Sequence, residues 1–312
     1  MASDRPQAAA PAAGAGDPWQ RVAAVTVTHH SAAVIGACLS RLGAGAEVIV
    51  VDNASDDASR EIAHGARPDA RLIHNRVGLG YGNGINCGLR LAHREFVLMI
   101  NPDAMLMPEA LTRLVAAADR YPSAAILAPL MLAPDGHAVA SHDVGLLARS
   151  GRPRKRLDAE CSGDLCADYL SGAAMLVRRR ALDEVGGFDP NIFLYYEDDD
   201  LCLRLRRKGW SLVLVADAKV EHIGGGSVRA GWPALWEKFW HMAWSRLYLE
   251  RKYRGTGAML GVAAPLLVRY SGKAFLYLVA FNRMKLVRDA ARFCGTAGYL
   301  LGIPAMPKAP LP

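Results

Sequence analysis

Residues 22–28 read VAAVTVT, and this apolar, β-branched run predicts the buried strand around which the fold is built. Outward from it, similar runs at residues 47–51 and 96–100 predict two more strands. Further strands are expected at residues 71–74, 125–129, 173–177 and 212–215. Helices are expected at residues 32–42, 59–64, 83–94, 108–120, 180–185 and 197–208. Because short strands alternate with helices, the sequence predicts an α/β fold with a mostly parallel sheet covered on both faces.

Polar side chains stand at the ends of three of these strands, at Thr28, Asp52 and Asp103. In open parallel sheets, ligands bind beyond the carboxyl ends of the strands. The position of these side chains therefore predicts a ligand cleft at that edge of the sheet.

Asn101-Pro102-Asp103 directly follows the strand at residues 96–100. Pro102 restricts the turn and so fixes the direction of the carboxylate. A hard divalent cation needs oxygen ligands and usually bridges substrate phosphates, so this carboxylate suits a metal site. The alternative is an aspartate that only caps a helix.

Glu197-Asp198-Asp199-Asp200 places four acids at the start of an expected helix. The helix dipole favours acids there, and Asp200 can pair with Arg204 one turn later. Four adjacent negative charges still repel one another, and a carboxylate crowded in this way should have a raised pKa. Such a group suits general-base work near neutral pH.

Three further segments carry weaker signals. Asp52-Asn53-Ala54-Ser55 can bind a base or ribose through hydrogen bonds, or can form an ordinary capped loop. The glycine-rich residues 78–88 allow close backbone approach to a ligand, or a tightly packed turn. They do not follow the first strand, which disfavours a dinucleotide-binding turn. His222 can ligate a metal, contact a phosphate or be structural.

Composition and charge limit the class of protein. The 312 residues suffice for one large α/β domain or two smaller ones, and 52% hydrophobic residues exclude disorder of the whole chain. The net charge of +7 is uneven, because residues 231–312 hold 12 Lys and Arg against 3 Asp and Glu. This surplus predicts an anionic partner, either membrane or nucleic acid. Residues 1–20 lack the apolar core of a secretory signal and are expected to be a disordered tail, in a cytoplasmic protein with reduced cysteines.

The basic part of the chain is expected to be helical. Residues 234–254 repeat aromatic side chains such as Trp236 and Trp240 at helical spacing, which suits a membrane interface or packing on the α/β domain. Residues 258–281 are strongly apolar, but a proline and basic side chains interrupt them, which disfavours a transmembrane span of about 20 apolar residues. Residues 231–312 are therefore expected to form a helical, basic, amphipathic extension that associates with a membrane or packs on the domain.

Taken together and in order, these segments resemble family 2 glycosyltransferases with the GT-A fold, and within them the rhamnosyltransferase-like branch. The matching segments are VTVT (25–28), VDNAS (51–55), GYGNGINCG (80–88), NPD (101–103), GGFD (186–189), EDDD (197–200) and His222. Each is a weak signal alone, whereas the ordered set is specific. The resemblance implies a Rossmann-like mixed sheet flanked by helices, with a catalytic domain at residues 21–230.

For the donor end of the site, the resemblance implies that Thr28 and Asp52 hold the nucleotide base and ribose. Where the family has Thr-Tyr-Asn, this chain has Thr28-His29-His30, and His29 would replace the tyrosine that stacks on the base. Further donor contacts are expected from Asn53, Gly80, Asn86 and Asn101.

For the reacting end, the resemblance implies a variant of the family's metal-binding Asp-x-Asp motif, with Asn101 first and Asp103 last. Asp103 and His222 would ligate Mg²⁺ or Mn²⁺ at the diphosphate. Asp198 would be the catalytic base, with Glu197 beside it.

The implied reaction is a single inverting displacement on a nucleotide-sugar donor. Rhamnose from dTDP-rhamnose is favoured, and other UDP- or dTDP-sugars stay open. The acceptor would be a glycan or a lipid-linked sugar in cell-surface polysaccharide synthesis. The enzyme would then be peripheral on the inner face of the cell membrane.

Two other functions fit the residues less well. A nucleotidyltransferase would need a glycine-rich, basic loop directly after the first strand, where this chain has Thr28-His29-His30-Ser31. A non-catalytic membrane-binding protein would not need the ordered motifs. A nucleic acid in the cleft would be repelled by the acids at residues 197–200, so no nucleic-acid partner is expected.

Overall fold

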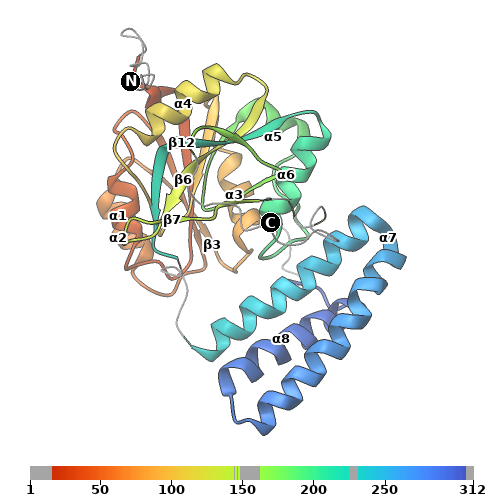
Figure 1. The fold of residues 1–312 in the computed structure, drawn as a ribbon. Coiled ribbons are helices and arrows are strands. Elements are labelled where there is room, and N and C mark those ends of the chain that lie inside the picture. The colour runs from red at the N-terminus through yellow and green to blue at the C-terminus, as the bar shows by residue number, and fades with distance from the viewer. Residues whose placement is uncertain (1–15, 144, 146, 148–161, 225–230, 307–312) are drawn as a thin grey trace, which may run out of the picture.

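The computed structural model describes residues 16–143, 145, 147, 162–224 and 231–306. Most of the predicted tail, the basic residues 149–156 and the residues from 225 to 230 lie outside this range. Figure 1 shows an α/β body with a pair of long helices beside it. The predicted division of the chain at residue 230 falls between these two parts and stays a prediction.

A mixed sheet forms the centre of the α/β body, with the strand order β3-β2-β1-β4-β11-β6-β12-β5. Its strands are β1 (Val22–Thr28), β2 (Glu47–Asn53), β3 (Arg71–Asn75), β4 (Phe96–Ile100), β5 (Ala104–Leu106), β6 (Ala124–Leu132), β11 (Ala174–Arg178) and β12 (Ser211–His222). Strands β1 to β4 run parallel, whereas β11 is antiparallel to both β4 and β6. Short strands extend this frame: β7 (Ala138–Val139) pairs with β6, β9 (Leu165–Cys166) with β12, and β8 (His142–Asp143) with β10 (Tyr169–Leu170).

Helices cover both faces of the sheet. They are the 3₁₀ helix η1 (Pro18–Arg21), α1 (Ile35–Ser40), α2 (Ser59–Ala66), α3 (Tyr81–Leu89), α4 (Ala110–Arg120), α5 (Arg179–Val185) and α6 (Glu197–Arg207). Side chains of β1 alternate between two cores, as the pleat of a strand requires. Val22 and Ala24 face α1 and α4, whereas Ala23 and Val25 face α3, α5 and α6. The predicted α/β fold is therefore confirmed.

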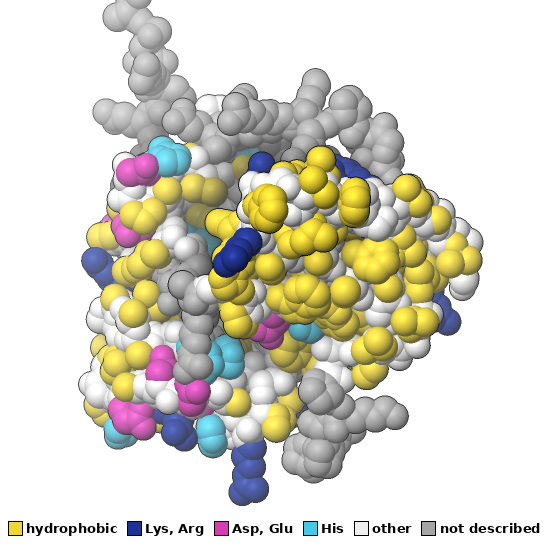
Figure 2. All heavy atoms as spheres, turned by 90° about the horizontal axis from the view of Figure 1, so that it is seen from below, with side chains coloured by type: hydrophobic (Ala, Val, Ile, Leu, Met, Phe, Trp, Pro, Cys, Tyr) yellow, Lys and Arg dark blue, Asp and Glu magenta, His cyan; other side chains and the backbone are white. Residues whose placement is uncertain are grey.

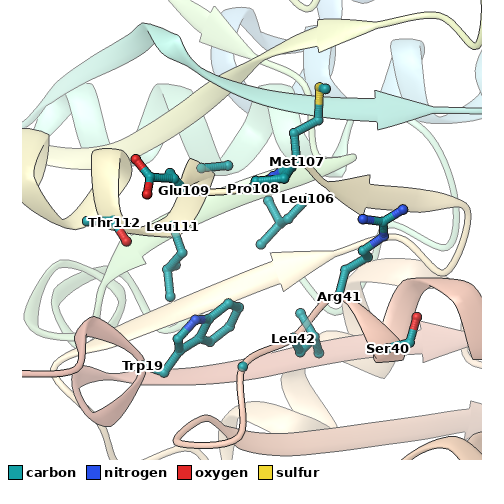
Figure 3. A pocket seen from close by; sticks show the side chains of 12 residues that line it. Trp19, Ser40, Arg41, Leu42, Leu106, Met107, Pro108, Glu109, Leu111 and Thr112 are labelled. Atoms are coloured by element: carbon teal, nitrogen blue, oxygen red, sulfur yellow. The ribbon is translucent and has the colours of Figure 1, made fainter.

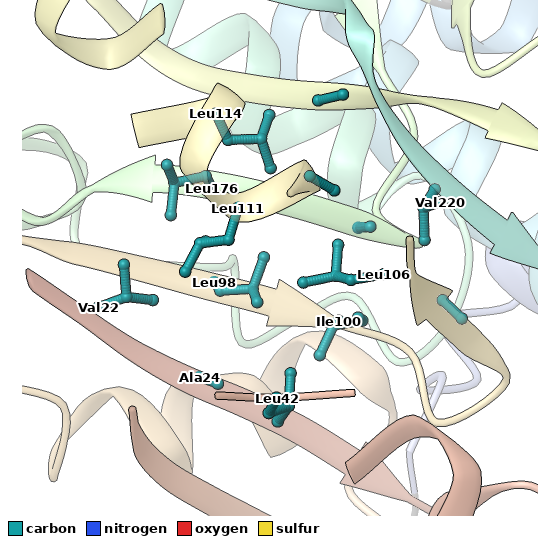
Figure 4. Packing of buried hydrophobic residues seen from close by; sticks show 14 of the residues in the cluster. Val22, Ala24, Leu42, Leu98, Ile100, Leu106, Leu111, Leu114, Leu176 and Val220 are labelled. Carbon is teal, nitrogen blue, oxygen red and sulfur yellow. The ribbon is translucent and has the colours of Figure 1, made fainter. Parts of the chain in front are cut away.

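The core under α4 illustrates this packing. Figure 4 shows Leu111 and Leu114 of α4 directed at the sheet, above Leu98 of β4 and Leu176 of β11. All four side chains are almost completely buried. Full burial of such side chains stabilises the fold by about 1.5–3 kcal/mol each, and this packing holds the strand ends in place.

Some predicted elements have different bounds in the structure. The strand expected at residues 212–215 continues to His222, because after an irregularity between Val215 and Lys219 it resumes pairing with β6 and adds β5 on its other side. Strands β5, β7, β8 and β9 were not predicted, since two or three residues carry too little periodicity. The continuation of β12 matters most, because it carries His222 to the site.

The extension forms a helical hairpin, α7 (Trp232–Val279) and α8 (Arg283–Leu300), linked by a short turn. Gly255, with a φ of 84°, interrupts α7. The half of α7 before this glycine is bound to the α/β body. Lys252 Nζ lies 2.5 Å from Asp189 Oδ2 and 2.5 Å from Asp200 Oδ1, and the Tyr253 hydroxyl donates to Asp200 at 2.6 Å.

Two tryptophans of α7, Trp240 and Trp244, pack inside the hairpin. A Cβ at Gly295 of α8 would lie 2.3 Å from the carbonyl oxygen of Trp240, so only glycine permits this approach. Trp244 Nε1 donates to the Ile303 carbonyl at 2.8 Å, and Trp236 is 39% exposed. For Trp240, the structure favours packing over the membrane-facing alternative.

Candidate functional site

The predicted site residues lie along one edge of the sheet. The carboxyl ends of β2, β1 and β4 meet there, and Thr28 pairs in register with Asp52. Because β11 is antiparallel, it begins at this same edge, with Ala174 opposite Ile100. Segments distant in sequence therefore line a single edge.

Thr28 and Asp52 stand at the carboxyl ends of β1 and β2, where donor binding was predicted. Among the described residues, Thr28 Oγ1 and Asp52 Oδ1 are buried without a hydrogen-bond partner. Buried polar atoms in proteins nearly always have partners, so two adjacent atoms without one suit the polar groups of a ligand. The other oxygen of Asp52 lies 2.8 Å from His74 Nδ1, which fixes the carboxylate. His74 was not predicted as a site residue.

Asn53 connects the end of β2 to the glycine-rich turn. Its amide donates to the Gly80 carbonyl at 3.1 Å and accepts from the Leu79 amide at 3.0 Å. His29, whose ring is exposed, lies with Nδ1 2.8 Å from the Asn53 carbonyl. Gly80 has a φ of 81°, and a Cβ there would lie 1.9 Å from the Phe193 carbonyl oxygen. This turn therefore requires glycine.

The rest of the glycine-rich stretch serves packing. A Cβ at Gly84 would lie 2.8 Å from Val27, and one at Gly88 would lie 2.4 Å from Val25, so the glycines let α3 approach β1 closely. The Asn86 side chain both donates to and accepts from the backbone of Phe188, at 2.9 Å each. Asn86 therefore holds the loop that leads to α6 and brings no unused polar group to the edge.

Asp103 and His222 meet because β5 and β12 pair. Ala104 lies opposite His222 in this antiparallel ladder, and His222 Nε2 lies 3.3 Å from Asp103 Oδ1. Within the described residues, no group of three or more His, Cys, Asp or Glu side chains could hold a metal ion. The two side chains fit a cation that takes its remaining ligands from substrate phosphates and water, as Mg²⁺ commonly does.

Asn101 links this pair to the next part of the edge. Its backbone amide donates to the Ala173 carbonyl at 2.8 Å, and its carbonyl accepts from the Ala104 amide at 3.0 Å. The turn after β4 is thus tied to the segment just before β11. Gly172 in that segment contacts the predicted base.

Asp198 is oriented by two donors. Its Oδ2 accepts from the Tyr169 hydroxyl at 2.6 Å and from the Gly172 amide at 3.1 Å. Tyr195 and Tyr196 both adopt left-handed φ values, 66° and 68°, just before α6. Such a conformation is strained for bulky residues, and it starts the helix abruptly with Asp198 in the first turn.

Tyr81 binds the segment that also contacts Asp198. Its hydroxyl donates to the Gly172 carbonyl at 2.9 Å. Burial raises the pKa of Tyr81 well above its usual range, and the nearby carboxylates of Glu197, Asp198 and Asp103 raise it further. Tyr81 and Asp198 thus both contact the backbone of Gly172, Tyr81 at its carbonyl and Asp198 at its amide.

The remaining acids of the run differ in role. Burial, and then the charge of Asp198, raises the pKa of Glu197 to about 8. The raised pKa expected from sequence is found at Glu197, but burial is its main cause and the neighbouring charge comes second. Asp200 is fully buried and binds Arg204 at 2.7 Å, as predicted, and it also binds Lys252. Asp200 therefore belongs to the attachment of the hairpin.

Three residues of the site were not predicted: His74, Tyr81 and Tyr169. Tyr81 stands inside the glycine-rich stretch and His74 at the end of a predicted strand, so both had a positional signal. Tyr169 follows a polar segment without periodicity, and nothing in the sequence pointed to its contact with Asp198.

A cavity of about 310 Å³ lies elsewhere, as Figure 3 shows. Trp19, Arg41 and Glu109 are among its lining residues. Trp19 precedes β1, whereas the predicted cleft is at the other end of that strand. None of the predicted site residues lines this cavity.

Comparison with known proteins gives a family match. The family model described as glycosyl transferase family 2 matches residues 23–186. An N-acetylglucosaminyl-diphospho-decaprenol L-rhamnosyltransferase of Mycobacterium tuberculosis H37Rv is 33% identical over 201 residues, covering 56% of this chain and 66% of that protein. The rhamnosyltransferase WbbL of Escherichia coli K12 is 25% identical over 245 residues, covering 73% and 92%. The match thus spans just under two thirds of the mycobacterial protein.

Solved structures share the fold. The mannosyltransferase PcManGT of Pyrobaculum calidifontis, solved with GDP-Man and Mn²⁺, has a TM-score of 0.57 at 16% identity, covering 90% of this chain and 87% of that one. Residues 1–349 of Staphylococcus aureus TarS have a TM-score of 0.51 at 15% identity, covering 90% and 92%. At such identity the likeness concerns the fold alone.

Proposed function

This chain belongs to glycosyl transferase family 2, and on that premise we propose that it transfers a sugar from a nucleoside-diphosphate donor to an acceptor hydroxyl, with inversion at the anomeric carbon. One observation carries the proposal. Asp198 accepts hydrogen bonds from Tyr169 and Gly172, the next residue, Ala173, accepts from the Asn101 amide, and Asp103 lies 3.3 Å from His222. The proposed base and the proposed diphosphate-binding pair therefore lie on segments that are joined through the backbone of residues 172 and 173.

In the proposed reaction, Asp198 accepts the proton of the acceptor hydroxyl. The acceptor oxygen then forms a bond to the anomeric carbon while the bond from that carbon to the diphosphate oxygen breaks. The hydrogen bonds from Tyr169 and Gly172 keep the carboxylate directed during this step. At the other end, Thr28 and Asp52 would hold the nucleoside, so the donor would lie along the sheet edge.

Asp103 and His222 would hold Mg²⁺ or Mn²⁺ together with the donor's diphosphate. A bound cation would neutralise the charge that develops on the leaving nucleoside diphosphate. The PcManGT structure contains Mn²⁺, which supports a divalent ion in this fold. With Asn101 in place of a second acid, the site should bind metal far better with donor than without it.

We favour dTDP-rhamnose as donor, because two relatives are named rhamnosyltransferases. The name of the mycobacterial relative supports a sugar on a polyprenyl diphosphate as acceptor, in cell-surface polysaccharide synthesis. A thermal-shift panel of dTDP-, UDP- and GDP-sugars, each with Mn²⁺ or with EDTA, tests both points. The expected result is stabilisation by dTDP-rhamnose with Mn²⁺; stabilisation by a different nucleotide sugar only would replace the donor assignment.

The catalytic proposal is tested with Asp198→Asn and, as matched control, Asp199→Asn. Loss of the base should reduce transfer by roughly 10²–10⁴-fold. Binding of the donor, measured by calorimetry, should stay close to that of the unmodified protein. Equal transfer rates for Asp198→Asn and the unmodified protein would remove Asp198 from this role.

A further inference from the structure

The second half of α7, residues 256–279, carries an apolar face on the outside of the molecule. Val268, Phe275 and Val279 recur at helical spacing on this face and are 74%, 69% and 61% exposed. On the opposite side, Met259 is buried in the hairpin. This part of α7 therefore carries apolar side chains on its outer as well as its inner side, a pattern typical of helices buried in a protein or a membrane.

The apolar surface continues around the turn of the hairpin. Phe281 is 91% exposed and Met284 is 62% exposed. Figure 2 shows apolar side chains gathered over the helical hairpin, with Lys and Arg near its margins. An apolar surface of this extent on a soluble molecule marks a site of interaction.

The charges around this face are all of one sign. Between Gly255 and Arg288 the sequence contains no Asp or Glu, and its Lys and Arg are Arg269, Lys273, Arg283, Lys285 and Arg288. The next acid, Asp289, is fully buried between Arg288 and Arg292. Basic residues beside an apolar face complement anionic lipid headgroups, whereas a second copy of the chain would bring like charges together.

The face suits lying on a membrane better than crossing it. By length and composition alone, α7 is the one helix of the described residues that could span a bilayer. Arg269 and Lys273 interrupt its apolar segment, and α8 along its side carries further charges. Lys252 meanwhile fixes the first half of α7 to the α/β body. Long basic side chains on such a helix extend to the headgroups while their stems stay apolar.

We propose that the outer face of residues 256–284 docks on the surface of an anionic lipid membrane. The face differs from the segment around Trp236 and Trp240 that sequence periodicity favoured, because Trp240 packs against Gly295 of α8 and Lys252 binds the same half of α7 to the α/β body. Lys252 and Tyr253 join α7 to α6, the helix whose first turn contains Asp198. Docking would thus hold the proposed base at a fixed distance from the bilayer. Lipid binding needs no sugar transfer, so either proposal can fail while the other stands.

Flotation of the full chain with vesicles tests the apolar contribution. The vesicles contain phosphatidylcholine with or without phosphatidylglycerol. The triple variant Val268→Ser/Phe275→Ser/Phe281→Ser removes three exposed side chains and should keep its thermal midpoint. Its partition onto phosphatidylglycerol vesicles should fall more than tenfold. Leu72→Ser, at an exposed leucine of β3, is the matched control and should float like the unmodified protein.

The charge contribution is tested with Arg283→Gln and Lys285→Gln, with Arg90→Gln on the α/β body as control. Each hairpin substitution should lower partition onto phosphatidylglycerol vesicles by about fivefold, and the control should not. Equal flotation of the triple variant and the unmodified protein would overturn the proposal. The proposal would also be overturned if light scattering showed that the unmodified protein is a dimer and the triple variant a monomer, while neither of them floats with the vesicles.

Discussion

Tyr169 and Asp198 form the shortest polar contact of the site, and it gives a prediction at the scale of single residues. Tyr169→Phe removes the 2.6 Å donor and leaves only the Gly172 amide on that oxygen. A hydrogen bond to a charged group contributes about 1.5–3 kcal/mol, so kcat should fall roughly 10- to 100-fold. The KM for the donor should change little, because Tyr169 orients the base and does not bind the donor.

Tyr121→Phe is the control for this substitution, since it removes a Tyr–Asp contact, to Asp164, remote from the site. It should leave kcat unchanged. If Tyr169→Phe raised KM and spared kcat, the role of Tyr169 in orienting Asp198 would be wrong.

Glu197 gives a prediction about pH. Its folded-state pKa of about 8 lies above the ordinary 4.5, so the folded protein holds this proton more tightly than the unfolded chain does. The free energy of unfolding should therefore fall as pH rises from about 4.5 to about 8, by at most a few kcal/mol. Glu197→Gln should lack this part of the decline. Urea denaturation in EDTA across that pH range measures the free energy of unfolding of both proteins. If it depended on pH in the same way for the Glu197→Gln and the unmodified protein, the prediction would be contradicted.

At the residue scale, sequence order alone predicted which acids to examine. The predicted contact of Asp200 with Arg204 is present, and Asp103 and His222 are neighbours. The sequence could not show that Asp200 also binds Lys252, that Tyr169 contacts Asp198, or that Tyr81 contacts Gly172. These contacts join residues far apart in the chain, and local periodicity carries no information about them.

At the scale of elements, α3 shows how glycine sets the distance between a helix and the sheet. Gly88→Ala would place a methyl group 2.4 Å from Val25 Cγ1. Overpacking of this kind costs about 1–3 kcal/mol, so the urea midpoint should fall. Gly65→Ala in α2, with nothing within 4 Å, should instead be neutral or stabilise by up to about 1 kcal/mol. A Gly88→Ala protein as stable as Gly65→Ala would contradict this account of the close approach.

The longer elements were predictable and the short ones were not. Strands β1, β2 and β4 are continuous apolar runs, because both of their faces are buried. Because of the irregularity in β12, the sequence did not predict that the strand at residues 212–215 continues to His222. Pairing with β5 and β6 decides that continuation, and pairing partners are a property of the folded sheet.

At the scale of the whole molecule, Lys252 attaches the hairpin to the α/β body. Lys252→Met leaves Asp189 and Asp200 without the cation between them, and loss of one partner of a buried pair costs about 3–5 kcal/mol. Lys238→Met, at an exposed lysine of the same helix, is the control. The measurement is limited proteolysis together with urea denaturation. Equal protease resistance of the two variants would show that Lys252 does not fix the hairpin.

The sequence by itself determined the fold class, the family and the acids of the candidate site. These follow from apolar runs, turn residues and the order of short motifs, which are local properties of the chain. The tertiary structure decided which acid carries the raised pKa, which polar atoms lack partners and which half of α7 is exposed. Those properties depend on burial and on contacts across the chain. A tryptophan-rich segment and an apolar one look alike in sequence, and only packing shows which of them is left uncovered.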